Sequence, residues 1–173
     1  MNRVPKTPIV KFGSHLPVLI KVMSITTGPA LEMGMGFNSS LVMHWMCSVK
    51  KRLLVSYEND FDCFDWPLRA GRFANEFHQV IYIEDWGKAD IEKPWDVAFI
   101  DHVPALRRKE DVKRLAKHAK YIILHDTEGR LEKYHHYQEI YPLFKWKYDY
   151  QDYIPKTSVL SNFVDLTNFT VEL

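Results

Sequence analysis

The sequence has only two cysteines, Cys47 and Cys63, and they are not spaced as a CxxC pair. This scarcity excludes a disulfide framework and fits a reducing compartment, so we expect a cytoplasmic protein. No apolar run approaches the roughly 18 residues that a membrane-spanning helix requires. No apolar run follows the first residues either, so we expect neither a signal peptide nor a membrane partner.

A large net charge is also missing, because 23 Lys and Arg residues stand against 22 Asp and Glu residues. A formal charge of +1 gives no strong signal for nucleic-acid binding, although a local basic patch remains compatible with it. The 173 residues, of which 46% are hydrophobic, suit one globular domain spanning residues 1–173. We expect residues 1–27 to form an N-terminal arm and helix, and a homo-oligomer is compatible with the composition.

Short apolar runs alternate with amphipathic segments along most of the chain. Strands are expected at residues 30–33, 53–57, 79–83, 95–100, 121–124, 144–150 and 157–166. Helices are expected at residues 15–25, with Ser14 as the N-cap, and at 39–49, 65–78, 109–120 and 131–140. This alternation predicts a three-layer, Rossmann-like α/β sheet that is mostly parallel. The last two strands have no helix between them, which predicts a C-terminal antiparallel strand pair.

Residues 29–40 are the most informative segment, since a buried strand runs into a glycine turn and then a helix start. Gly34 and Gly36 would let backbone approach a ligand, and the helix would offer free N–H groups. Ser39 stands where a dinucleotide fingerprint has its third glycine, so a nicotinamide cofactor is disfavoured. The acidic Glu32 would repel a pyrophosphate but favour a sulfonium. The segment resembles motif I of the class I S-adenosylmethionine (SAM)-dependent methyltransferases, which implies SAM as the cofactor.

Further cofactor contacts are expected where later strands end. Glu58 closes the second strand, where a carboxylate can accept both ribose hydroxyl protons, although it could equally cap the following turn. Asp85 and Trp86 close the third strand and could receive the adenine amino group and stack on its ring; packing under a loop is the alternative for Trp86.

The segments Ile100-Asp101-His102 and His125-Asp126-Thr127 suggest the catalytic groups. They resemble strand ends of small-molecule methyltransferases, in some of which acids at these places hold a divalent cation. The resemblance implies metal ligation by Asp101 and Asp126, with Asp101 also near the cofactor, although Thr127 departs from that pattern. Without a metal, His102 or His125 could act as general base.

These patterns together predict a SAM-dependent methyltransferase that acts on an oxygen or nitrogen of a small-molecule acceptor. Arg107 is the preferred candidate for binding an acidic group of the substrate or of SAM. A methyltransferase acting on nucleic acid or protein, and a non-catalytic protein with the same fold, are the alternatives. The resemblance covers residues 29–166 and includes small, little-studied members of the superfamily.

Overall fold

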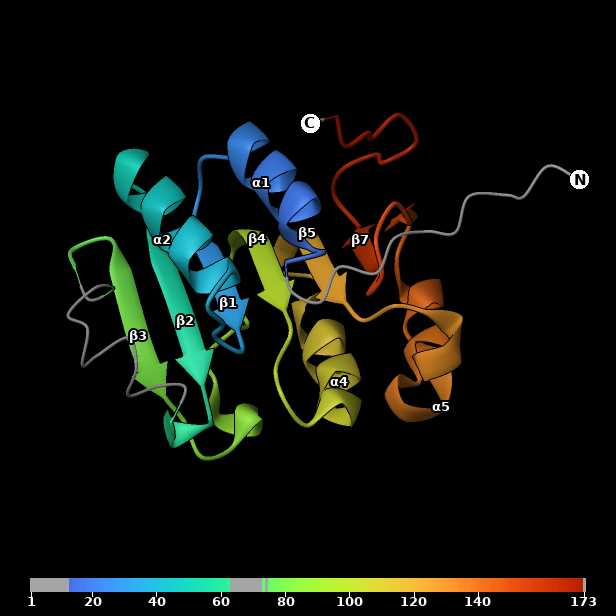
Figure 1. The fold of residues 1–173 in the computed structure, drawn as a ribbon, viewed down its shortest axis with the longest axis horizontal. Helices are drawn as coiled ribbons and strands as arrows, with labels where there is room; N and C mark the ends of the chain where they lie inside the picture. Colours follow the sequence, from blue (N-terminus) through green and yellow to red (C-terminus); the bar gives the residue numbers. More distant parts are fainter. Residues whose placement is uncertain (1–12, 63–72, 74, 173) are drawn as a thin grey trace, which may run out of the picture.

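The computed structural model describes residues 13–62, 73 and 75–172. Its centre is a seven-stranded sheet with the strand order β3-β2-β1-β4-β5-β7-β6 (Figure 1). The strands are β1 (Ala30–Met33), β2 (Leu54–Glu58), β3 (His78–Tyr82), β4 (Trp95–Ile100), β5 (Ala119–His125), β6 (Trp146–Tyr150) and β7 (Thr157–Ser161). The helices are α1 (Leu16–Ile25), α2 (Ser39–Val49), α4 (Ala105–Leu115) and α5 (Glu132–His135), with 3₁₀ turns at Trp86–Lys88, Gly129–Leu131, Tyr137–Glu139 and Tyr141–Leu143.

The strand order reverses between β1 and β4. β2 and β3 lie on one side of β1, and β4 and β5 lie on its other side. β1 pairs in parallel with both β2 and β4, β2 with β3, and β4 with β5. β7 then pairs antiparallel with β5 and with β6. The expected parallel sheet with a C-terminal antiparallel pair is therefore confirmed, and β1 and β4 form the switch point at which such sheets bind ligands.

Helices cover both faces of the sheet, which gives three layers (Figure 1). β4 shows why, since Val97 and Phe99 pack with α1 and α2, whereas Ala98 and Ile100 pack with α4. Every residue of β4 is buried, as expected for a strand sandwiched between helical layers. Among the described residues, no helix is both long and apolar enough to cross a membrane.

Several expected helices differ from those observed. The helix expected at 109–120 runs from Ala105 to Leu115, because Pro104 occupies its N-cap position and starts it earlier. The helix expected at 131–140 is only four residues long, since His136 takes a left-handed φ of 55° and ends it. The helix expected at 65–78 falls largely on residues 63–72 and 74, outside the described residues, and His78 already belongs to β3.

Ser14 does not cap the first helix. The N-cap of α1 is His15, and no side chain makes a capping bond there. The Ser14 hydroxyl instead lies 3.0 Å from Nε2 of His125 at the end of β5. The hydroxyl that was expected to cap the helix makes a tertiary contact instead.

Candidate functional site

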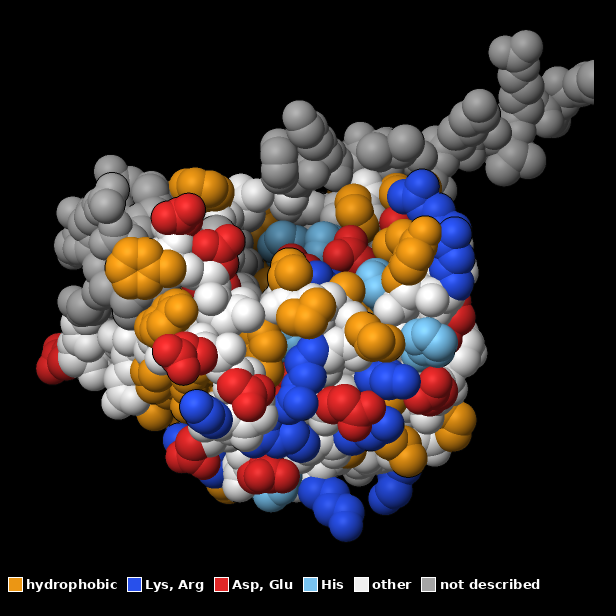
Figure 2. All heavy atoms as spheres, turned by 90° about the horizontal axis from the view of Figure 1, so that it is seen from below, with side chains coloured by type: hydrophobic (Ala, Val, Ile, Leu, Met, Phe, Trp, Pro, Cys, Tyr) orange, Lys and Arg blue, Asp and Glu red, His pale blue; other side chains and the backbone are white. Residues whose placement is uncertain are grey.

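Two adjoining cavities open at the carboxyl ends of the parallel strands. The histidine cavity, of about 420 Å³, is lined by residues 13–15 and 34–39 with Asp101, His125 and Pro155. The acidic cavity, of about 530 Å³, is lined by residues 34–35, 58–61 and 101–104. Both volumes suit a small ligand. Figure 2 looks onto this end of the sheet and shows histidine and acidic side chains together in a hollow.

Gly34, Met35 and Asp101 line both cavities. The two spaces therefore meet at the ends of β1 and β4, at the switch point of the sheet. A single elongated ligand can pass from one cavity into the other across these residues.

The two glycines of the turn differ in what surrounds them. Gly34 has a φ of +88°, and a Cβ there would lie 2.6 Å from both the Cα and the N of His102. Glycine is therefore needed at this position so that the ends of β1 and β4 can approach each other. At Gly36 the nearest atom to an added Cβ is Ser39 Oγ at 3.5 Å, so the protein itself leaves room there.

Glu32 lies beneath the turn and not in a cavity, contrary to the expected ligand contact. It is fully buried and accepts hydrogen bonds from Ser40 Oγ at 2.9 Å and from Ser56 Oγ at 2.6 Å. Ser40 Oγ in turn accepts the N–H of Gly36. Burial raises the pKa of Glu32 to about 7, against the lowering effect of these bonds. Glu32 therefore shapes the turn from behind.

Glu58 lines the acidic cavity and also makes the capping bonds that were the alternative for it. Its Oε1 accepts the N–H groups of Asn59 and Asp60, both at 2.8 Å, and its Oε2 accepts the N–H of Met35 at 2.7 Å. The carboxylate thus ties the end of β2 to the turn after β1. A contact between Glu58 and a ribose stays a prediction.

Asp85 and Trp86 do not line either cavity. The exposed Asp85 accepts the N–H of Gly87. Trp86 is buried and stacks on His102 with ring centroids 4.1 Å apart. Its indole N–H donates to the carbonyl of Val103. The alternative of packing under a loop is what the structure shows, and the indole face expected for adenine is covered by His102.

The His102 side chain is also unsuited to the general-base role expected for it. It is 1% exposed, and its Nε2 lies 3.1 Å from Oδ2 of the fully buried Asp111. Burial lowers the pKa of His102, although Asp111 opposes that effect. The ring holds the loop after β4 in place from behind.

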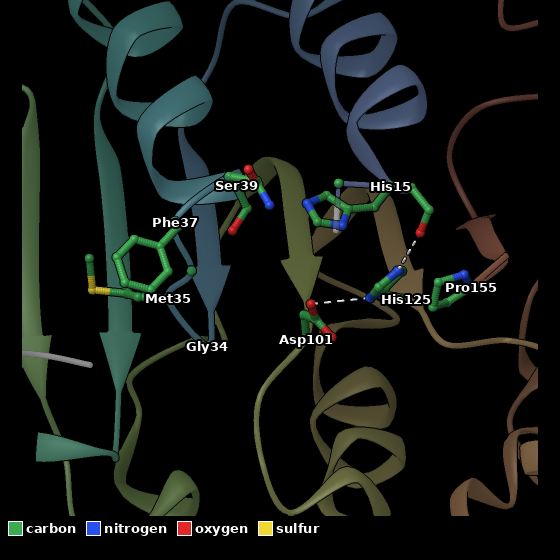
Figure 3. A pocket seen from close by; sticks show the side chains of 12 residues that line it. His15, Gly34, Met35, Phe37, Ser39, Asp101, His125 and Pro155 are labelled. Carbon is green, nitrogen blue, oxygen red and sulfur yellow. Dashed lines mark hydrogen bonds and ion pairs between the residues drawn. The ribbon is translucent and has the colours of Figure 1, made fainter. Parts of the chain in front are cut away.

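Asp101, His125 and His15 form the polar wall of the histidine cavity (Figure 3). Nδ1 of His125 lies 3.2 Å from Oδ2 of Asp101, and burial of His125 is outweighed by Asp101 and Asp126, which raise its pKa. The hydrogen bond from His125 and the charge of Arg108 keep the pKa of Asp101 low, although burial opposes them. Burial and the nearby His125 lower the pKa of His15 to about 4, so its imidazole is neutral at pH 7.

Arg108 occupies the space between the two carboxylates that were expected to hold a metal. Its guanidinium lies 3.0 Å from Oδ1 of Asp101 and 3.0 Å from Oδ2 of Asp126, and its Nε donates to the carbonyl of His102 at 2.7 Å. Asp126 lines neither cavity. A buried arginine therefore lies between Asp101 and Asp126 and binds both of them, and metal ligation by that pair is not supported.

Arg107, the arginine preferred from the sequence, faces elsewhere. Its guanidinium makes two 3.0 Å bonds to Asp111, and it lines neither cavity. The two arginines occupy adjacent positions of α4, where Arg108 is buried and Arg107 is partly exposed. The orientation of the helix on the sheet therefore decides that Arg108, and not Arg107, reaches the strand ends.

Among the lining residues that were missed from the sequence, two bear on the chemistry of the site, His15 and Phe61. His15 was expected only as the start of a helix, and nothing in the local pattern links it to Asp101, 86 positions away. Phe61 lines the acidic cavity with 60% of its surface exposed, and its ring packs edge-on against Tyr82. An apolar residue just after an acidic strand end is the one signal that pointed to it.

The fold resembles that of several solved methyltransferases at low sequence identity. The N-terminal domain of human METTL16 in complex with SAH (S-adenosylhomocysteine) matches with a TM-score of 0.58 and 11% identity, over 94% of this chain and 75% of that one. A putative O-methyltransferase from Klebsiella pneumoniae gives 0.59 and 12%, over 92% and 84%. A methyltransferase from Pyrococcus furiosus gives 0.59 and 14%, over 88% and 84%.

Sequence comparisons identify no relative of this chain. A scan against protein-family models finds no match, and a search of curated proteins finds none either. At identities of 11–14% the likeness rests on the arrangement of strands and helices. The chain has the fold of the class I SAM-dependent methyltransferases.

Proposed function

We propose that the protein transfers a methyl group from SAM to an oxygen or nitrogen atom of a small-molecule acceptor. The observation that carries this proposal is the pair of cavities joined at Gly34, Met35 and Asp101, on the switch point of a methyltransferase fold. SAM is an elongated molecule with a nucleoside at one end and an amino acid at the other. A two-part cleft of this kind fits it.

The acidic cavity suits the nucleoside. Oε2 of Glu58 accepts only the N–H of Met35 and keeps a second lone pair, so the carboxylate can still accept a ribose hydroxyl proton. Phe61 offers an exposed ring for the base, in the role expected of Trp86, and Val103 and Pro104 add apolar surface.

The turn at residues 34–39 suits the amino-acid end. The N-terminus of α2, at Ser39, lies at the histidine cavity, where its positive dipole end favours a carboxylate. The sulfonium then lies near Asp101, whose carboxylate favours a positive charge.

Bound SAM supplies an electrophilic methyl carbon on a positively charged sulfur. A lone pair of the acceptor forms the new bond to that carbon, the carbon–sulfur bond breaks with its electron pair left on sulfur, and the acceptor loses a proton. His15, Asp101 and His125 line the side of the cavity that a SAM molecule in this position leaves open. Their nitrogen and oxygen atoms can orient the acceptor and take up its proton.

The walls of the cavities favour a small acceptor over a nucleic acid. No Lys or Arg is among the described residues that line either cavity, and Figure 2 shows acidic and basic side chains mixed across this face. Backbone phosphates bind to clustered Lys and Arg. The METTL16 catalytic domain has been solved with an RNA hairpin, so an RNA acceptor is the alternative to test beside small ones.

Isothermal titration calorimetry with SAM, SAH and NAD tests the cofactor. We expect micromolar binding of SAM and SAH and none of NAD. Transfer of a labelled methyl group to panels of phenols, catechols, amines and short RNAs then tests the reaction. Failure to bind SAM and SAH at millimolar concentration would refute the proposal, and binding without transfer to any acceptor would favour a non-catalytic role.

A further inference from the structure

The geometry points to a binding site for one divalent transition-metal ion, ligated by His15, Asp101 and His125. One ligand atom from each of these three side chains lies within 4.8 Å of the other two. The three residues come from the start of α1 and from the ends of β4 and β5, and all of them face the histidine cavity (Figure 3).

His15 supplies the first independent observation. It is 6% exposed, yet neither ring nitrogen has a hydrogen-bond partner among the described residues. Buried polar groups are nearly always paired, and an orphaned pair of nitrogens in a cavity needs an explanation. The ring packs beside that of His125, with centroids 4.8 Å apart, and a metal ion between them would satisfy one of the two nitrogens.

The second observation is that the outer atoms of the other two ligands are already held. Arg108 binds Oδ1 of Asp101 at 3.0 Å, and the Ser14 hydroxyl lies 3.0 Å from Nε2 of His125. The inner atoms, Oδ2 of Asp101 and Nδ1 of His125, face each other at 3.2 Å. Two ligands on a metal with bonds of about 2.1 Å lie roughly 3 Å apart, so this pair has the spacing already.

Ser14 and Arg108 thus occupy the places of outer partners in a metal centre. A metal-bound histidine usually donates its second N–H to a neighbouring acceptor, and a bound carboxylate is itself hydrogen-bonded. This role also explains why the Ser14 hydroxyl contacts His125 and does not cap α1.

Two imidazoles and one carboxylate select Zn²⁺, Fe²⁺ or Co²⁺ and not Mg²⁺, which prefers oxygen ligands. Three protein ligands leave further coordination positions open toward the cavity. An acceptor hydroxyl bound there would have its pKa lowered close to the methyl group. That use of the ion rests on the proposed function, whereas the binding of the ion does not.

Metal titration of the full chain tests the site. The protein is stripped with EDTA, dialysed, and titrated with Zn²⁺ by calorimetry and with Co²⁺ by visible absorption, both without SAM. We expect one ion per chain at micromolar or lower Kd, intense d–d bands for bound Co²⁺, and no displacement by millimolar Mg²⁺.

Four variants connect that signal to the proposed ligands. His15→Ala should weaken Zn²⁺ binding by at least about 100-fold, and Ser14→Ala by roughly 10-fold. His136→Asn is the matched control, since His136 is exposed and Asn tolerates its left-handed backbone; its affinity should be unchanged. His15→Cys replaces one ligand by another, so it should retain Co²⁺ and add a thiolate charge-transfer band in the near ultraviolet.

Absence of Zn²⁺ and Co²⁺ binding, or wild-type affinity in His15→Ala, would overturn the site. SAH binding is measured separately in EDTA. Metal binding without SAH binding would support the site and contradict the proposed function, whereas SAH binding without metal binding would leave His15 as an unligated imidazole and overturn the site.

Discussion

The two glycines in the turn after β1 have different roles. Gly34 has a positive φ, and its Cβ position is filled by the backbone of Asp101 and His102. At Gly36 no protein atom would clash with an added Cβ. Only at Gly36 can the lack of a side chain be attributed to a ligand.

A pair of substitutions separates these tasks. Gly34→Ala should destabilise the protein by about 1–3 kcal/mol, because the added methyl group would clash with the backbone of His102 and alanine disfavours a positive φ. Gly36→Val should leave the urea unfolding midpoint nearly unchanged and weaken SAH binding at least 10-fold. Normal SAH affinity in Gly36→Val would remove this turn from the cofactor site.

We expect Glu32 to make the stability of the protein depend on pH. Its pKa of about 7 in the fold lies above the ordinary value of 4.5, so the native state holds the proton more tightly than the unfolded chain does. Its contribution to stability is complete below pH 4.5 and is lost as the pH rises through 7.

Glu32→Gln should remove this dependence, since glutamine mimics the protonated acid. The stability of the variant relative to wild type should rise by about 2 kcal/mol between pH 5 and pH 8. Urea unfolding at the two pH values measures it. A constant difference between the two proteins would show that Glu32 ionises normally in the fold.

Among the elements, α4 is joined to the ends of β4 and β5 by one side chain. Arg108 reaches from the helix to Asp101, Asp126 and the carbonyl of His102. These contacts fix the relative position of the two strand ends that carry Asp101 and His125. The precision of the histidine cavity therefore depends on a residue that does not line it.

Arg108→Met should cost about 3–5 kcal/mol, because it leaves two carboxylates without their buried partner. Arg107→Met is the control at the adjacent position. It should cost less, roughly 1 kcal/mol, since Arg107 is 30% exposed and Asp111 keeps its contact with Arg114. Equal costs in urea unfolding would contradict the assigned role of Arg108.

At the scale of the whole molecule, the ligand cleft lies between the two halves of the sheet. The cavities draw on β1, β2, β4 and β5 and on the segment before α1. A ligand seated there bridges elements that must separate when the chain unfolds, so its binding energy adds to the stability of the fold.

SAH at about 100 times its Kd should stabilise the native state by roughly 2.7 kcal/mol. For a chain of 173 residues this corresponds to a rise in Tm of about 5–10 °C. Thermal unfolding with SAH, and with NAD as the control, measures it. An equal shift with NAD would contradict a SAM-shaped cleft.

The sequence by itself determined the sheet, its antiparallel ending and the position of the glycine turn. Buried strands are short apolar runs, and the turn that follows β1 is encoded by neighbouring residues, so local pattern is sufficient to find them. The ends of α4 and α5 were less predictable, because Pro104 and the left-handed His136 override helical periodicity.

Only the tertiary structure decided which polar residues share the site. It brought His15 beside Asp101 and His125, gave Ser14 to His125, turned Trp86 and His102 into a buried stack, and placed Arg108 between Asp101 and Asp126. Each of these depends on contacts between residues far apart in the chain, on burial and on helix register. Those quantities are set when the layers pack, and no local pattern contains them.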